Sequence, residues 1–373
     1  MRYIYALFFS IGLICTSVAQ VPSGYYSTAD GLVEEALKTE LKEIINDINS
    51  GNETFVHIDQ GYGELWTAYQ NPESGDLDIY ESLENDNTIL DIYSENPDAS
   101  DPYNFTPVND QCGNYQDEGD CYNREHVVPQ SFFNGASPMR NDYHSTFPTD
   151  GKVNGFRGSL PYGEVSSASN TTANGSQIGP SNSPDYNGNV FEPIDEYKGD
   201  IARALFYFAT RYQDEFNNGS WDNPDDNFLD DNYLFYDQWL INVLLQWHQQ
   251  DPVDQKEIDR NNNGFDHQFN RNPFVDHPDF ALAIWDEGFN VADFSIADFK
   301  LTPNPVVNGN LKLKLNNIQK GNLRLYDLTG QQIRHYQIDN QITNLQLNFL
   351  AQGIYIAEFT SDKVKLTKKL IIK

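Results

Sequence analysis

The chain changes character near residue 297, and this change divides it into two parts that must fold differently. Residues 20–300 carry 13 Lys and Arg against 51 Asp and Glu, whereas residues 301–373 carry 10 against 4. The second part is a series of short runs with alternating apolar residues: LKLKL, NLRLYDLTG, QLNFL, GIYIAEF and KKLIIK. Such alternation is typical of strands with one buried face. It predicts a small all-β sandwich over residues 297–373.

The first 19 residues have the features of an export signal. Arg2 precedes an apolar run, and Val18 and Ala19 form a small-residue end. This pattern predicts a signal peptide over residues 1–19, cleaved before Gln20. A lipoprotein anchor at Cys15 is disfavoured because the large Ile14 precedes it. We expect no other membrane span, since no other stretch is long and apolar enough.

Residues 20–296 are expected to form a mainly helical α+β domain. Apolar residues recur every three or four positions from Val33 to Ile48, which predicts a helix. Two further apolar helices are predicted, one beginning near Asp200 with Ile201, Leu205 and other apolar residues on its core face, the other within 234–252. Residues 165–190 are rich in Ser, Asn and Gly, so we expect a surface loop there.

The chemically informative stretch runs from Cys121 to Glu164: CYNREHVVPQSFFNGASPMRNDYHSTFPTDGKVNGFRGSLPYGE. It contains Glu125 and His126 side by side, and Asn154 follows in DGKVNGFR. An imidazole can accept a proton near neutral pH, and carboxylate and amide oxygens suit Mg²⁺. These groups, with nearby arginines, are what metal-assisted phosphodiester hydrolysis requires.

These motifs resemble the endonuclease I family of secreted or periplasmic bacterial nucleases, which belong to the His-metal-finger (ββα-metal) nucleases. The likeness rests on REHVVPQSF, DYH, FP and GKVNGFR, on TILDIYSENPD before them, and on NRNPFVDHP after them. It implies a ββα-metal finger core in an enzyme that cuts DNA, and often RNA, with little sequence preference and leaves 5′-phosphate ends. It also implies that His126 is the base and that Glu125 and Asn154 bind the metal. Mg²⁺ is expected, with Ca²⁺ or Mn²⁺ as alternatives.

The C-terminal part resembles the sorting domain of type IX secretion, through its Pro-Asn-Pro opening, YDLTGQ, GIYIAEF and KKLIIK. This resemblance implies that secretion machinery is a partner and that the protein is extracellular or on the cell surface. A carbohydrate- or protein-binding module is the alternative reading.

Four basic residues near the motif are candidates for phosphate contact. Arg157 lies three residues after Asn154 on a predicted short helix, so both can face one way. We therefore expect Arg157, and after it Arg140, to be catalytic, because a guanidinium matches phosphate geometry. For Arg124 and Lys152 an ordinary surface salt bridge is the preferred reading.

Neighbours on a regular strand point to opposite faces, so the strand should end or bulge at Glu125 and His126. Asp142 and His144 are candidates to support the site from behind, although a structural role suits His144 as well.

Cys112 and Cys121 lie nine positions apart in an exported chain, which predicts a disulfide, with two free thiols as the alternative. DRNNNG, from Asp259, resembles the start of an EF-hand loop, but Asn270 stands where that loop requires a bidentate Glu.

The net charge of −31 argues against a broad basic surface for nucleic acid. The stretch 122–181 is balanced, with four basic and four acidic residues, so it is the least repulsive part of its domain. A catalytically silent binding protein on the same scaffold is the competing reading, and a Zn²⁺ hydrolase lacks any HxxxH cluster. The sequence predicts a secreted, metal-dependent nuclease, expected to be a monomer.

Overall fold

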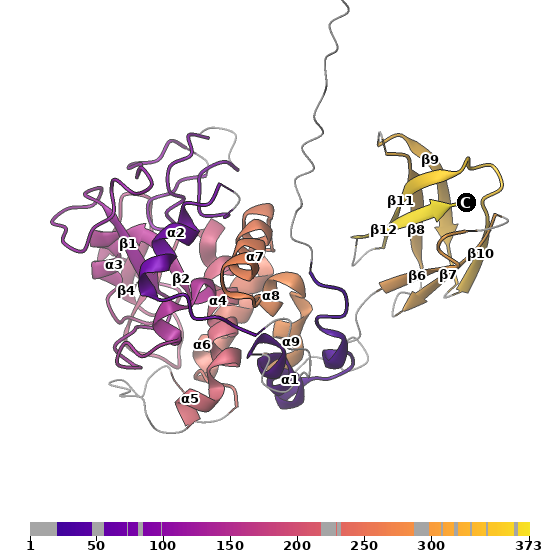
Figure 1. Cartoon of the computed structure of the whole chain (residues 1–373). Helices are drawn as coiled ribbons and strands as arrows, with labels where there is room; N and C mark the ends of the chain where they lie inside the picture. Colours follow the sequence, from indigo (N-terminus) through magenta and orange to yellow (C-terminus); the bar gives the residue numbers. More distant parts are fainter. Residues whose placement is uncertain are drawn as a thin grey trace, which may run out of the picture. The chain divides into compact units, whose positions relative to one another are not determined.

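The computed structural model describes residues 21–46, 56–72, 74–80, 85–97, 99–217, 229, 233–286, 298–306, 309–316, 320–328, 330–340, 342–361 and 365–373 (Figure 1). The expected signal peptide, residues 1–19, lies outside this described part. Ile48, the last residue of the first predicted apolar helix pattern, also lies outside it.

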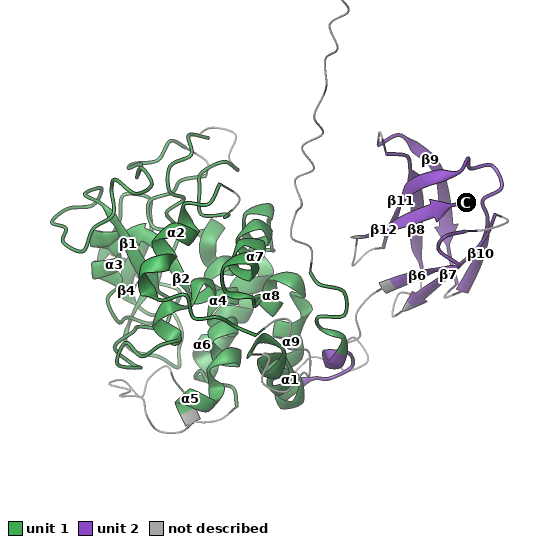
Figure 2. Cartoon of the chain, in the orientation of Figure 1, with its two compact units in different colours: residues 1–27, 34–286 green, residues 28–33, 287–373 purple. Residues whose placement is uncertain are grey.

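The chain divides into two compact units (Figure 2). Unit 1 comprises residues 1–27 and 34–286, and unit 2 comprises residues 28–33 and 287–373. The domain boundary expected near residue 297 falls at the edge of a segment outside the described residues, so it stays a prediction.

Unit 1 is mainly helical, with two small sheets. Its helices are α1 (Glu34–Asn46), α2 (Leu65–Tyr69), α3 (Gly151–Arg157), α4 (Lys198–Arg211), α5 (Gln213–Asn217), α6 (Gln238–Gln250), α7 (Gln255–Gln268), α8 (Pro273–Asp276) and α9 (Asp279–Trp285). Its short 3₁₀ helices are η3 (Tyr62–Glu64), η4 (Met139–Asn141), η5 (Tyr143–Ser145) and η6 (Asp195–Tyr197). A further 3₁₀ helix, η1 (Ser27–Ala29), includes residues assigned to both units. Its strands are β1 (Tyr122–His126), β2 (Thr146–Asp150), β3 (Asn170–Thr171), β4 (Gln177–Pro180) and β5 (Asn189–Glu192).

Helix α4 lies at the centre of unit 1, packed against α1, α6, α8 and η5 (Figure 1). The sequence predicted one buried face, but all of its residues are buried. Because a buried charge is costly unless it is paired, the polar residues of α4 need partners. Arg203 meets both carboxylate oxygens of Glu257 at 2.6 Å, and Arg211 pairs with Asp142.

Strands β1 and β2 are antiparallel, from Tyr122 opposite Asp150 to His126 opposite Thr146. The chain then passes directly from β2 into α3. Asp150 caps this helix by accepting hydrogen bonds from the amides of Lys152 (2.7 Å) and Val153 (2.9 Å). This strand–strand–helix order places both halves of the motif beside one another.

The structure shows what two segments of uncertain character in the sequence form. Residues 165–190 are not only a loop, because β3, β4 and β5 form an antiparallel sheet there. Gly179 permits this: a Cβ at that position would lie 2.3 Å from the carbonyl oxygen of Ser167. The EF-hand-like DRNNNG lies inside α7, and Gly264 there makes room for the ring of His144, which would approach an added Cβ to 2.2 Å.

In the described residues from Asp298 onward, unit 2 is all-β, as predicted. Its strands are β6 (Asp298–Thr302), β7 (Asn310–Asn316), β8 (Gly321–Tyr326), β9 (Gln332–Ile338), β10 (Ile342–Gln346), β11 (Gly353–Thr360) and β12 (Lys365–Ile372). They form two antiparallel sheets, ordered β10-β7-β6 and β12-β11-β8-β9. Alternate residues of both sheets, such as Leu313, Leu325 and Phe359, enter one shared apolar core.

Across the described residues, every helix is either too short or too polar to cross a membrane.

Candidate active site

The two halves of the motif line one open pocket of about 380 Å³ in unit 1. It is formed where β1 ends and α3 passes alongside. Its lining residues are Tyr62, Cys112, Gly113, Asn123, Arg124, Glu125, His126, Pro129, Gln130, Ser131, Asn154, Arg157, Gly158 and Ser159.

Glu125 is buried, and its described contacts all converge on one carboxylate oxygen. Oε1 accepts hydrogen bonds from the hydroxyls of Tyr93 and Tyr162, both at 3.0 Å, and pairs with Arg157 Nη1 at 3.1 Å. Burial raises the pKa of Glu125, while the neighbouring Arg157 acts in the opposite direction. The second oxygen, Oε2, has no partner among the described residues and can serve as a ligand.

His126 is the last residue of β1, so the strand ends where the sequence required it to end or bulge. Its Nε2 lies 3.0 Å from the carbonyl oxygen of Arg140. A carbonyl can only accept, so Nε2 must carry the proton, and Nδ1 keeps its lone pair. Burial lowers the pKa of His126 to about 4, so the ring is neutral at pH 7. Nδ1 is thus the atom that can accept a proton.

Arg157 is buried and turned toward the backbone at the end of β1. Its guanidinium donates to the carbonyl oxygens of His126 (3.0 Å) and Val127 (2.6 Å), in addition to its ion pair with Glu125. The phosphate contact that the sequence predicted for Arg157 stays a prediction, and Arg157 does line the pocket. The contacts that the structure describes hold Glu125 and the end of β1 in place.

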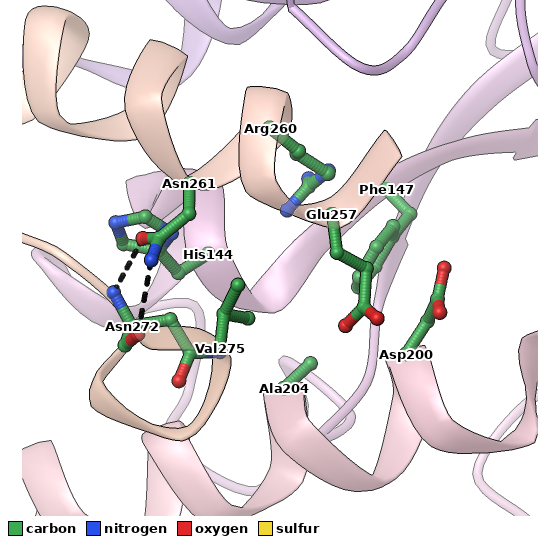
Figure 3. Close-up of a pocket in the computed structure, with 9 residues that line it drawn as sticks. All are labelled: His144, Phe147, Asp200, Ala204, Glu257, Arg260, Asn261, Asn272 and Val275. Carbon is green, nitrogen blue, oxygen red and sulfur yellow. Dashed lines mark hydrogen bonds between the residues drawn. The ribbon is translucent and has the colours of Figure 1, made fainter. Parts of the chain in front are cut away.

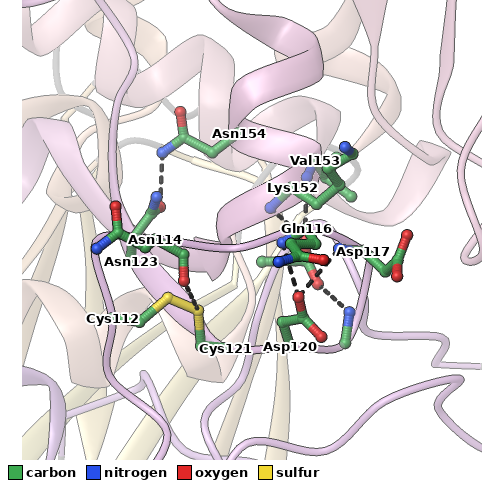
Figure 4. Close-up of a disulfide and its surroundings, with 12 residues drawn as sticks. Cys112, Asn114, Gln116, Asp117, Asp120, Cys121, Asn123, Lys152, Val153 and Asn154 are labelled. Carbon is green, nitrogen blue, oxygen red and sulfur yellow. Dashed lines mark hydrogen bonds between the residues drawn. A yellow bond between two sulfur atoms is a disulfide. The ribbon is translucent and has the colours of Figure 1, made fainter.

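Asn154, on α3, has a fixed amide. Its Nδ2 donates to Asn123 Oδ1 at 2.7 Å (Figure 4), which leaves the Oδ1 of Asn154 without a partner among the described residues. The pocket therefore offers one carboxylate oxygen and one amide oxygen. Hard oxygen ligands of this kind fit Mg²⁺, which typically takes one or two carboxylates and keeps several waters.

The predicted disulfide is confirmed: Cys112 and Cys121 are bonded, with Cα atoms 5.8 Å apart (Figure 4). The loop that it closes carries Tyr115, whose ring lies against α3. A Cβ on Gly151 would lie 2.6 Å from this ring, and one on Gly155 would lie 2.5 Å from its hydroxyl. The absence of a side chain at these two glycines therefore leaves room for Tyr115.

Comparison with known proteins shows the family of each part of the chain. A family model described as Endonuclease I matches residues 33–279, and one described as a secretion system C-terminal sorting domain matches residues 300–373. The chain belongs to the endonuclease I family. It is 33% identical over 266 residues to an extracellular ribonuclease of Bacillus amyloliquefaciens, covering 70% of this chain and 78% of that protein. An extracellular ribonuclease of Bacillus subtilis (strain 168) is 32% identical over 267 residues, with the same coverage.

Family membership and these relatives identify the chain as a secreted nuclease, a hydrolase that acts on nucleic acids. The sorting domain implies secretion machinery as a partner.

The two predicted supporting residues, Asp142 and His144, do not line the pocket. Asp142 is buried and accepts hydrogen bonds from Tyr207, Tyr212 and Gln268, besides its ion pair with Arg211. Burial alone would raise the pKa of Asp142, but Arg211 holds it well below its usual range. This network joins the N-cap of η5 to α4 and to the last residue of α7, so it supports the fold around the site.

His144 likewise lies in the interior, where its Nε2 is 2.9 Å from the carbonyl oxygen of Asn270. Burial lowers the pKa of His144 to about 4. The ring borders a cavity of about 20 Å³ between α4 and α7 (Figure 3), which is far too small for a nucleotide.

The structure also brings together residues that sequence analysis did not. Arg124 lines the pocket. The sequence favoured a surface salt bridge for this residue, but it forms none with the described residues. Its guanidinium carbon lies 3.4 Å from the ring centre of Tyr62, and that of Arg140 lies 4.0 Å from the same centre. Lys152, by contrast, has its amine over Phe156 on its own helix.

A separate acidic group lies outside the pocket. Asp78, Glu95 and Asp101 each place one carboxylate oxygen within 4.8 Å of the others, an arrangement that could hold a cation. These residues are spread over 24 positions with no recognisable ligand spacing, so no sequence motif points to them.

Proposed function

We propose that this chain is a divalent-metal-dependent endonuclease that hydrolyses phosphodiester bonds of DNA and RNA with little sequence preference and leaves 5′-phosphate ends. The observation that carries the proposal is that Glu125, His126 and Asn154 line one pocket. Each of them keeps an acceptor atom without a partner among the described residues: Glu125 Oε2, His126 Nδ1 and Asn154 Oδ1. The relatives named extracellular ribonucleases favour RNA as a substrate alongside DNA.

Glu125 and Asn154 would hold the metal ion, which family members generally use. When bound, a divalent ion neutralises charge on the phosphate and assists the leaving oxygen. Mg²⁺ suits this donor set, and Ca²⁺ and Mn²⁺ also accept oxygen ligands. The order β1, β2, α3 supports assignment of the motif to a ββα-metal finger.

His126 takes a proton from the attacking water through Nδ1. The Arg140 carbonyl fixes the ring in the tautomer that this step requires. The tyrosine hydroxyls donate to Oε1 and Arg157 pairs with it, so all three favour the charged form of Glu125 against the effect of its burial. Arg140 is the candidate to stabilise negative charge on the phosphate.

The experiment is cleavage of duplex DNA, single-stranded DNA and RNA by the purified mature protein. We expect cleavage with Mg²⁺, none after EDTA, and recovery when Mg²⁺ is restored. Glu125→Gln should abolish cleavage, while Glu118→Gln, a control in the disulfide-closed loop, should retain it.

Cleavage that persists in EDTA would exclude metal dependence. Binding of nucleic acid without cleavage under any metal would favour the silent binding protein instead.

A further inference from the structure

Arg124 and His126 leave the same face of β1. They are two residues apart on a regular strand, so their Cα atoms are separated by roughly 6.6 Å. Glu125, between them, points to the opposite face, toward Tyr93 and Tyr162. Arg124 therefore lies one strand repeat from the proposed base, and both residues line the same pocket.

The side chain of Arg124 is held in position. Its guanidinium carbon lies 3.4 Å from the ring centre of Tyr62 and 4.2 Å from that of Trp66. Its Nη1 donates to the carbonyl oxygen of Tyr62 at 2.6 Å. Stacking on aromatic faces leaves the edge of a guanidinium, where its N–H donors lie, free to meet a phosphate.

The positive charge of Arg124 and its neighbour Arg140 favours binding of an anion. Arg140 stands over the same Tyr62 ring, at 4.0 Å from its centre, and neither arginine has a salt bridge to a carboxylate within the described residues. Two guanidinium groups that share one ring repel each other. In a chain of net charge −31, acidic partners are plentiful elsewhere, so the lack of one here is informative.

We propose that Arg124 binds the phosphate next to the one being cleaved, and that Tyr62 positions it to do so. This inference rests on the proposed function, because it assumes that a nucleic-acid strand lies along β1 with its scissile phosphate at His126. Every nucleotide brings a phosphate, so a strand in that position carries a second one past the neighbouring residue on the same face. The site thus recognises a substrate with at least two consecutive phosphates.

Dinucleotides test this directly. One that has a single phosphodiester bond is compared with the same molecule carrying an additional 5′-terminal or 3′-terminal phosphate, which the enzyme does not cleave as a diester. We expect one of the two phosphorylated forms to have a kcat/KM roughly 10- to 100-fold higher than the unphosphorylated form, mainly through KM, as for a charge-assisted hydrogen bond. The terminus that gives the increase tells in which direction the strand runs.

In Arg124→Gln the ratio of kcat/KM between the phosphorylated and unphosphorylated dinucleotides should fall to near one. On long DNA, the slope of log(kcat/KM) against log salt concentration should become less steep by about one. Lys152→Gln is the matched control and should keep the ratio. Tyr62→Phe, which retains the ring and the backbone carbonyl, should keep it too, whereas Tyr62→Leu should lower it.

A wild-type ratio near one for both phosphorylated forms would overturn the proposal, and this result needs no variant to fold. An unchanged ratio in folded Arg124→Gln would also overturn it. Failure of the wild-type protein to cleave any polynucleotide is a distinct outcome, which would refute the proposed function itself.

Discussion

Glu125 and His126 are adjacent in the sequence yet have separate roles, because successive side chains leave opposite faces of β1. Glu125 enters a buried set of donors, and His126 turns to the Arg140 carbonyl. The residue types and their order were enough to predict that these two and Asn154 share a site. They could not predict the contacts of Arg157, because those depend on carbonyl groups exposed where β1 ends.

Arg124 shows a second limit at this scale. Its stacking partner Tyr62 lies 62 residues earlier in the chain, and no local pattern links the two. Reading Arg124 from its neighbours alone therefore suggested a surface salt bridge.

The role of His126 is tested by His126→Ala. We expect the variant to fold and bind metal but to lose about 10²–10⁴-fold in cleavage rate, the usual contribution of a general base. Because the pKa of His126 is lowered to about 4, the wild-type base stays unprotonated down to pH 5. The measurement is the initial rate on duplex DNA at saturating Mg²⁺. A variant that kept more than about a tenth of the wild-type rate would exclude His126 as the base.

At the scale of elements, the helical periods and alternating strands were predictable, and the glycines were not. From sequence alone, the glycines of α3 suggest close approach of a ligand, and the glycine of α7 suggests a calcium-binding loop. In the structure they are places where a ring from a distant segment packs against a helix. The sheet formed by β3, β4 and β5 was missed for a related reason, because its composition is that of a loop while its backbone groups pair with one another.

Gly264→Ala tests the packing of α7. The new Cβ would lie 2.2 Å from the His144 ring, which is buried and cannot move aside freely. We expect the free energy of unfolding to fall by about 1–3 kcal/mol, the usual cost of overpacking, measured by urea denaturation. Gly63→Ala is the control, since no atom lies within 4 Å of its added Cβ. If both variants were equally stable, the close contact would not constrain the helix.

For the whole molecule, the division into an acidic mainly helical part and a basic all-β part follows from composition, since charge and periodicity change together. What composition cannot give is the exact boundary. The change spreads over residues that lie between the last helix of unit 1 and the first strand of unit 2.

Removal of residues from Ala297 onward tests the division. The pocket residues all belong to unit 1, so we expect the truncated protein to keep cleavage activity close to that of the full chain. Export past the outer membrane should be lost, because the sorting domain is gone. The measurements are specific activity of the purified protein and its distribution between cells and medium. If the truncated protein folded but was inactive, residues from Ala297 onward would be part of the catalytic unit.

The contact of Tyr115 with Gly151 and Gly155 has a consequence for how this sequence can diverge. A side chain at either glycine would collide with the ring, whereas loss of the ring would leave α3 with a gap and two poor helix formers. In descendants of this gene, an alanine at 151 or 155 is therefore expected only beside a small residue at 115.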